Sequence, residues 1–187
     1  EGSHTMEFSI TVLSGDGIGP EVTEQGVRLL DAVGQHFGHK FRFFHGDIGG
    51  MSIGRNGTAL PQVTLDLAHQ SDAVLLGAVG GPKWDDPSAT IRPEDGLLGI
   101  RKGLGLYANL RPIRVFPQLA TWGPLKQDVV EGTDLIVIRE LTGGLYFARP
   151  KKRWSTASGR RGIDTLRYSE NEIRRILLVG FTLARSR

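Results

Sequence analysis

The chain of 187 residues contains no cysteine, no long apolar run and no Gly-Lys-Ser/Thr sequence. Without cysteine it can form neither disulfide bonds nor thiolate metal sites, which fits a reducing compartment, so we expect a cytoplasmic protein. No apolar run approaches the roughly 18 residues that a membrane-spanning helix needs, so we expect no membrane association. The missing Gly-Lys-Ser/Thr sequence excludes a P-loop nucleotide site.

Charge of one sign is also not in large excess, because 23 lysines and arginines are balanced by 20 aspartates and glutamates. One basic stretch stands out, from Pro150 to Arg161. It lacks the aromatic-studded sheet or recognition-helix pattern of a nucleic-acid site, so we interpret it as a solvated loop and expect no nucleic-acid partner. Residues 1–5 are typical of a tag remnant, with Met6 as the native start and no signal peptide before the first strand.

The amino-terminal part alternates between strand-like and helix-like segments. Apolar runs typical of buried strands cover Phe8–Leu13, Phe41–Phe44 and Ala73–Val79. Segments with helical spacing lie between these strands. The first begins at Pro20 and has an apolar stripe of Val22, Val27, Leu30 and Val33, and the second covers Pro61–His69. This alternation predicts an α/β fold with a parallel-rich sheet and flanking helices.

The later part predicts a different mixture of elements. Glu94–Lys102 can form a helix, Tyr107–Val115 and Leu135–Arg139 are strand-like, and Leu145–Arg149 fits one arm of a hairpin or an excursion from the body. Asn171–Ala184 has an apolar face at helical spacing. We therefore expect strands, a projecting segment and a final amphipathic helix.

Two glycine-rich segments follow predicted strands. The turn Gly15–Pro20 resembles a dinucleotide fingerprint, but the third glycine of the pattern is replaced by Pro20, and no acidic residue ends the second strand. We therefore expect a fold that is not of the Rossmann type. Residues 81–95 have no periodicity and predict an exposed loop at the carboxyl end of the third strand, where open α/β sheets bind ligands.

Three arginines and a tyrosine recur in unusual surroundings between Gly96 and Tyr146. Arg101 lies in Gly-Leu-Leu-Gly-Ile-Arg-Lys, Arg111 in Asn-Leu-Arg-Pro, and Arg139 with Tyr146 in Arg-Glu-Leu-Thr-Gly-Gly-Leu-Tyr. Guanidinium groups stay charged and offer planar pairs of donors, which match carboxylates and phosphates better than lysines do. Each arginine alone is typical of a surface ion pair, whereas the joint pattern predicts a binder of small dianions.

These segments, with the Gly15–Val22 turn and the Leu76–Asp85 segment, resemble the isocitrate/isopropylmalate family of β-decarboxylating dehydrogenases. The resemblance runs from Phe8 to the last residue. Family members continue for roughly as many residues again, so we expect a truncated chain corresponding to the first half of the enzyme. The resemblance implies that residues 6–106 are the first part of the cofactor-binding domain. Residues 107–187 would then be part of the second domain, which binds the substrate and forms the dimer.

The resemblance also implies roles for individual residues. Substrate binding is expected at Leu97, Arg101, Arg111 and Arg139, and proton transfer at Tyr146. NAD binding is expected at Ile18, Gly81, Pro82, Lys83, Trp84, Asp85 and Glu94. The resemblance also implies a divalent metal, Mg²⁺ or Mn²⁺. The aspartates that bind this metal, and a catalytic lysine, are expected in the other half of the enzyme, so we expect no metal ligand in this chain.

The implied activity is NAD-dependent oxidative decarboxylation of 3-isopropylmalate in leucine biosynthesis. The apolar pair Leu97 and Leu98 suits an isopropyl group, whereas isocitrate enzymes carry serine and asparagine there. A D-malate or tartrate dehydrogenase of the same family is the alternative enzyme, and a catalytically silent fragment or binding module is the alternative of another class. We expect the chain to be inactive alone and, as in the family, to form a homodimer.

Overall fold

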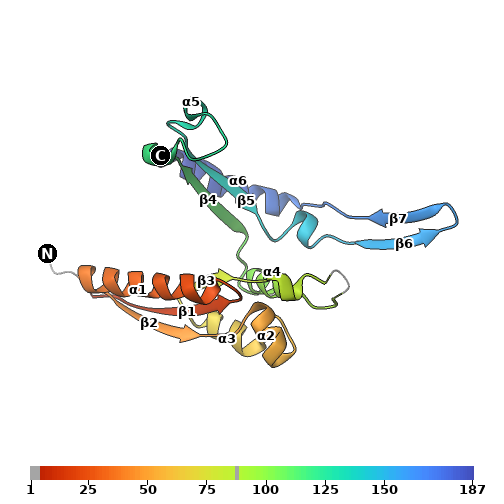
Figure 1. The fold of residues 1–187 in the computed structure, drawn as a ribbon, viewed down its shortest axis with the longest axis horizontal. Helices are drawn as coiled ribbons and strands as arrows, with labels where there is room; N and C mark the ends of the chain where they lie inside the picture. Colours follow the sequence, from red (N-terminus) through yellow and green to blue (C-terminus); the bar gives the residue numbers. More distant parts are fainter. Residues whose placement is uncertain (1–4, 87–88) are drawn as a thin grey trace. The chain divides into compact units, whose positions relative to one another are not determined.

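The computed structural model describes residues 5–86 and 89–187. They divide into two compact units, Glu1–Leu104 and Gly105–Arg187, each of which is described by itself (Figure 1). The tag remnant predicted at residues 1–5 lies outside the described residues except for Thr5. No helix in the described part of the chain has the length and apolar character needed to cross a membrane.

The first unit is a three-stranded parallel sheet with helices between its strands. Its elements are β1 (Glu7–Gly15), α1 (Gly19–Phe37), β2 (Lys40–His45), α2 (Gly49–Asn56), α3 (Gln62–His69), β3 (Ala73–Ala78), a 3₁₀ turn (Pro82–Trp84) and α4 (Pro93–Gly103). The strand order is β2-β1-β3, with β1 parallel to both neighbours. The predicted parallel α/β architecture is therefore confirmed.

Helices cover both faces of this sheet. On one face Leu13 of β1 packs with Ile48, Ala68 and Ile100, which come from the segments around α2, α3 and α4. On the other face α1 approaches β3 closely, since a Cβ on Gly26 would lie 3.2 Å from Leu75. Neighbouring residues of a strand point to opposite faces, and here Leu75 faces α1 while Leu76 packs on the core beneath the other helices.

The buried face of α1 differs from the predicted apolar stripe. Its fully buried residues are Gly19, Thr23 and Gly34, and Val22 is 49% exposed. Small residues let the helix lie close to the strands, so the contact depends on backbone approach more than on large side chains. Assigning Val22 to the buried stripe was therefore wrong.

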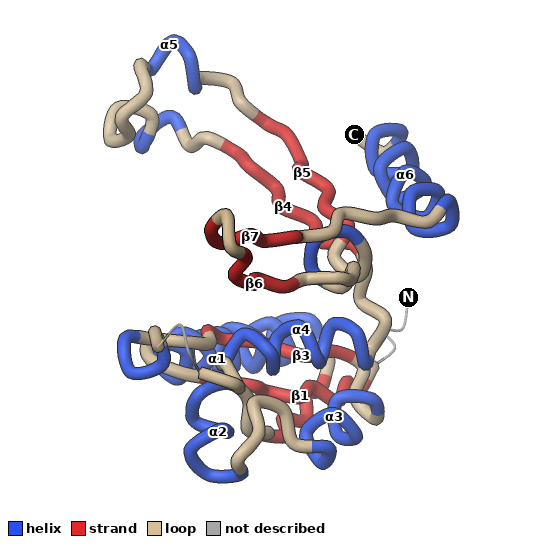
Figure 2. The backbone as a smooth tube through the Cα atoms, turned by 90° about the vertical axis from the view of Figure 1, so that its right-hand side faces the viewer, coloured by secondary structure: helices blue, strands red, loops and turns tan. Residues whose placement is uncertain are grey.

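The second unit contains two antiparallel strand pairs and a long helix. Its elements are β4 (Ala108–Arg114), a 3₁₀ turn (Pro117–Leu119), α5 (Gln127–Val130), β5 (Asp134–Glu140), a 3₁₀ turn (Gly144–Tyr146), β6 (Lys152–Thr156), β7 (Gly159–Ile163) and α6 (Glu170–Arg185). β4 pairs with β5, and the segment that carries α5 connects their far ends (Figure 2). β6 pairs with β7.

The basic stretch predicted to be a loop forms most of the β6–β7 hairpin. Lys152 pairs with Ile163, and Thr156 with Gly159 across a tight turn, in which Gly159 has a φ of 114°. Every residue of both strands is exposed, so the sequence has no buried face to reveal a strand period. Of the two alternatives predicted for Leu145–Arg149, the hairpin arm is wrong, because the strands of the hairpin are Lys152–Thr156 and Gly159–Ile163.

Candidate functional site

The predicted cofactor residues of the first unit lie at the carboxyl end of the parallel sheet. Gly81 to Asp85 follow β3 and include the 3₁₀ turn, and Ile18 is the exposed N-cap residue of α1. Glu94 is the second residue of α4, and its Oε1 would lie 3.0 Å from a Cβ placed on Gly80. The structure thus brings Glu94 and the start of this loop together.

Asp16 ties this loop to the rest of the unit, a role that sequence reasoning missed. Its Oδ2 accepts hydrogen bonds from the backbone N–H groups of Gly50 and Gly80, at 2.7 and 2.9 Å. Its Oδ1 accepts from Met51 N–H at 2.6 Å. The side chain belongs to a residue that is 6% exposed, so these bonds satisfy a buried carboxylate.

Trp84 gives the loop a second attachment, on α2. A Cβ on Gly50 would lie 2.1 Å from Trp84 Nε1, so the indole packs directly on the glycine backbone at the start of α2. Lys83 places its ammonium 4.9 Å from the centre of the Trp84 ring. Trp84 is therefore a packing anchor for the loop.

Helix α4 carries two of the predicted substrate residues. Leu97 and Arg101 are four positions apart and both partly buried, so they lie on adjoining parts of one helix surface. Pro93 begins the helix, and the Asp95 carboxylate accepts from the backbone N–H of Arg92 at 2.8 Å. This capping fixes where the helix starts, and with it which way Leu97 and Arg101 project.

The second unit places Arg111 and Arg139 on one face of the β4–β5 ribbon and brings Arg139 into contact with Tyr146. Asn109 is paired with Arg139 across the β4–β5 ribbon, and Arg111, two residues further along, lies on the same face. Arg111 Nε donates to Asn109 Oδ1 at 2.7 Å. The Arg139 guanidinium lies 4.9 Å from the centre of the Tyr146 ring, a cation–π contact.

A hollow of about 460 Å³ opens beside Arg139 and Tyr146, lined also by Lys151 and Tyr168. Lys151 forms an ion pair with Asp164 at 3.1 Å. Tyr168 packs against Gly144, whose φ of 64° and lack of a side chain leave room for it. Sequence reasoning missed both residues, and the only signal for Lys151 was its place in the basic stretch.

Glu140 fixes the turn between Arg139 and Tyr146. Its carboxylate accepts from the backbone N–H groups of Thr142 and Gly143, at 2.9 and 2.7 Å. Arg175 of α6 pairs with the same carboxylate at 2.5 Å, where the Glu140 side chain is 7% exposed. The Arg175 guanidinium also lies over the Tyr107 ring. A partly buried ion pair therefore joins β5, which carries Arg139, to α6.

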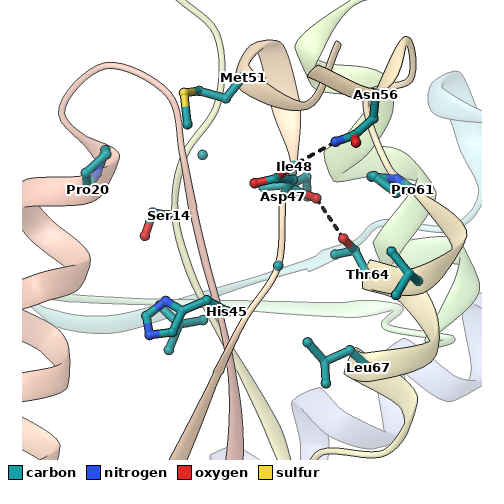
Figure 3. A pocket seen from close by; sticks show the side chains of 14 residues that line it. Ser14, Pro20, His45, Asp47, Ile48, Met51, Asn56, Pro61, Thr64 and Leu67 are labelled. Atoms are coloured by element: carbon teal, nitrogen blue, oxygen red, sulfur yellow. Dashed lines mark hydrogen bonds between the residues drawn. The ribbon is translucent and has the colours of Figure 1, made fainter. Parts of the chain in front are cut away.

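A cavity of the first unit lies apart from these residues. It has a volume of about 510 Å³ and is bordered by the ends of β1 and β2 and by α2 and α3, with residues such as Ser14, His45 and Met51 along its wall (Figure 3). Figure 3 also shows Asp47, bonded to Asn56 and Thr64, on this wall. None of the predicted site residues lines it.

One nucleophile-like pattern proves to be structural. Residues 50–54 read Gly-Met-Ser-Ile-Gly, which matches the serine-hydrolase pattern Gly-x-Ser-x-Gly. Ser52, however, is 0% exposed within α2 and donates to the carbonyl oxygen of Thr58 at 2.7 Å. A fully buried hydroxyl that is already hydrogen-bonded cannot act as an exposed nucleophile. Among residues 5–86 and 89–187, no three histidine, aspartate or glutamate side chains gather to hold a metal ion.

A glycine loop beyond a parallel sheet in one unit and an arginine–tyrosine face in the other are typical of an α/β protein that binds a small anion. A model of the isocitrate/isopropylmalate dehydrogenase family matches residues 9–187. The chain belongs to this family.

Comparisons with individual relatives agree with this family assignment. The chain is 56% identical to 3-isopropylmalate dehydrogenase of Dehalococcoides mccartyi and 52% identical to that of Aquifex aeolicus, each over 97% of this chain and 50% of the relative. The crystal structure of a β-decarboxylating dehydrogenase from Thermococcus kodakarensis superposes with a TM-score of 0.63 at 28% identity, over 96% of this chain and 46% of that one. The chain thus spans about half the length of the relatives it matches.

Proposed function

We propose that the chain is the amino-terminal half of an NAD-dependent 3-isopropylmalate dehydrogenase of leucine biosynthesis. The observation that carries the proposal is the shared strand face of Arg111 and Arg139 together with the contact of Arg139 with Tyr146, in a chain more than half identical to proteins of that name. We further propose that the complete protein is a cytoplasmic homodimer, in keeping with the family resemblance.

The arginines are proposed to hold the two carboxylates of the substrate. Arg111 offers its remaining guanidinium donors from a side chain that Asn109 already orients, and Arg139 adds a second charge on the same face. Arg101 is proposed as a further substrate contact on the family resemblance alone. Fixed carboxylates hold the C2–H bond in one orientation, so that its hydride can depart to NAD while the hydroxyl proton leaves to a base.

Tyr146 is proposed to give the final proton. After oxidation at C2 the carboxylate on C3 leaves as carbon dioxide, and its bonding electrons form an enolate that must be protonated at C3. The Tyr146 ring lies against Arg139 in a hollow that Lys151 also lines. We propose that the positive charge of Arg139 beside the ring supports this proton transfer from Tyr146.

The loop after β3 fits a dinucleotide. Gly80 and Gly81 have φ values of 96° and 152°, and a Cβ on Gly81 would meet no described atom within 4 Å, so its backbone is open to a ligand. We propose that Gly81 to Asp85, Ile18 and Glu94 contact NAD, which accepts the hydride. Mg²⁺ or Mn²⁺ would polarise the substrate oxygens, with ligands from the half that the relatives have in addition.

Substrate choice tests the proposal. The completed enzyme, meaning this chain co-expressed with the carboxyl-terminal half of one of its relatives, is assayed with 3-isopropylmalate and with D-malate. We expect a preference for 3-isopropylmalate in kcat/KM, which falls about tenfold or more in Leu97→Ala if the leucine packs on the isopropyl group. Leu29→Ala, at an exposed position on α1, is the matched control. Equal use of both substrates, or a ratio that Leu97→Ala leaves unchanged, contradicts 3-isopropylmalate as the substrate and favours D-malate or tartrate.

A further inference from the structure

Asp16 occupies an unusual position, because one buried carboxylate serves two segments that are distant in sequence. Gly50 and Met51 lie 34 and 35 residues from it, and Gly80 lies 64 residues away. Its own backbone is fixed as well, since Asp16 N–H donates to Ala78 at 2.6 Å and its carbonyl accepts from Gly19 at 2.8 Å. The carboxylate is thus held where the Gly15–Pro20 turn, the start of α2 and the segment after β3 meet.

Two of the three hydrogen bonds have a local explanation. Gly50 and Met51 are the second and third residues of α2, whose N-cap residue Ile48 has no side-chain hydrogen bond. Asp16 therefore caps α2 from outside the helix, and its negative charge suits the helix amino terminus. The bond to Gly80 adds nothing to that cap, because Gly80 belongs to the segment after β3.

The third bond acts on the predicted cofactor loop. Gly80 is the residue before Gly81 and, with a φ of 96°, it turns the chain away from β3. The loop is then attached at its start by Asp16 and at Trp84 by packing on Gly50. Both attachments end on the amino terminus of α2, so Asp16 and Trp84 together hold the loop against one fixed element.

We propose that Asp16 is the positioning residue of the cofactor loop: its carboxylate holds the Gly80 N–H and thereby orders Gly81 to Asp85 for a dinucleotide. The proposal rests on the function proposed above. A carboxylate is required because all three partners are donors, whereas an asparagine would turn its own N–H₂ towards at least one of them. An unordered loop would lose part of its binding energy to the cost of ordering.

Asp16→Asn in the completed enzyme is the first test. A bond to a charged group is lost, so we expect KM for NAD to rise about tenfold or more, with KM for 3-isopropylmalate changed less than twofold. Asp47→Asn is the control, because Asp47 is also a carboxylate bonded to α2, through Arg55 and Asn56, and has no bond to Gly80.

A second variant separates loop positioning from helix capping. Gly80→glycolate, which exchanges the backbone N–H for an ester oxygen, leaves Asp16 and the α2 cap intact and should reproduce the rise in KM for NAD. Amide hydrogen exchange of the chain itself should show faster exchange through residues 81–85 in both variants. This readout also serves if Asp16→Asn folds poorly.

The outcomes are distinct. If the parent completed enzyme uses NAD and Gly80→glycolate leaves the KM for NAD unchanged, the positioning role is overturned and Asp16 is a helix cap only. Exchange through residues 81–85 that stays at the parent rate in Gly80→glycolate overturns it too. A parent completed enzyme without NAD-dependent turnover instead overturns the proposed function, and this inference with it.

Discussion

At the scale of single residues, Arg111 and Arg139 differ from ordinary surface cations in the contacts that orient their side chains. Arg111 is oriented by Asn109, and Arg139 lies against the Tyr146 ring. Neither contact neutralises the guanidinium charge, so both side chains are ordered while their charges stay available to an anion. Preordering of this kind lowers the entropy lost when a dicarboxylate binds.

Arg111→Lys in the completed enzyme should lower kcat/KM for 3-isopropylmalate by about 2–4 kcal/mol in transition-state free energy. An ammonium lacks both the planar fork and the Nε donor that Asn109 accepts. Steady-state kinetics measure the effect, with Arg114→Lys as control, since Arg114 lies on the same strand three residues away. A loss of less than threefold in Arg111→Lys would show that this arginine does not hold the substrate.

Some contacts of the candidate site could be predicted from the sequence and others could not. Arg139 and Tyr146 were predictable because they share a short segment, which the structure folds into one contact. Asp16 was not, because its partners are backbone groups up to 64 residues away, and backbone groups leave no trace in residue identity. Lys151 lay within a basic stretch, where a lysine that lines a hollow looks the same as a solvated one.

At the scale of elements, apolar periodicity predicted the segments that have a buried face. β1, β3, α3, α4 and α6 lie within a few residues of their predicted bounds. α2 was missed because its buried residues are Gly49, Gly50 and Ser52, which carry no hydrophobic signal. The β6–β7 hairpin was missed because both of its faces are exposed.

Helix α6 begins with a capping box that has a measurable dependence on pH. The backbone N–H and the hydroxyl of Ser169 donate to Glu172, at 2.7 and 2.9 Å. The backbone hydrogen bond from Ser169 is the main cause that holds the pKa of Glu172 below its ordinary value of 4.5, with help from the Ser169 hydroxyl and from Arg175. A lowered folded-state pKa means that this stabilisation is present above pH 4.5 and is lost as the pH falls through the folded-state value.

Ser169→Ala should therefore destabilise the chain by about 1 kcal/mol near neutral pH, and by less in acid, where Glu172 is protonated. Urea unfolding followed by circular dichroism measures the difference at both pH values. Ser186→Ala removes a hydroxyl at the opposite end of α6 and should have little effect. A Ser169→Ala penalty that grows towards acid pH would contradict the assigned role of Glu172.

At the scale of the whole molecule, α6 has one covered face and one open face. Ile138 of β5 lies beneath Gly180, at 3.6 Å from a Cβ placed there. Leu177, Leu178 and Phe181 are 52%, 60% and 69% exposed. An apolar surface of this kind is typical of an interface, and the chain spans about half the length of its relatives.

The chain alone should therefore self-associate or unfold with low cooperativity, and the second half of a relative should suppress both. Gel filtration with light scattering, at several protein concentrations, measures the association. Leu178→Lys should reduce self-association of the isolated chain, whereas Leu29→Lys on the exposed side of α1 should not. A monodisperse, cooperatively folded monomer that is indifferent to the added half would indicate an independent domain.

Activity by complementation tests the central claim most directly. The chain alone and the separately purified second half of the Dehalococcoides mccartyi relative are assayed singly and mixed, with 3-isopropylmalate, NAD and Mg²⁺, by the absorbance of NADH. Neither part alone should turn over, and the mixture should approach the ~10 s⁻¹ of an ordinary enzyme, with Tyr146→Phe in this chain reducing it strongly. Turnover by the chain alone, or a refolded mixture that contains both parts in one complex and forms no NADH, would contradict the account of this chain as half of a dehydrogenase site.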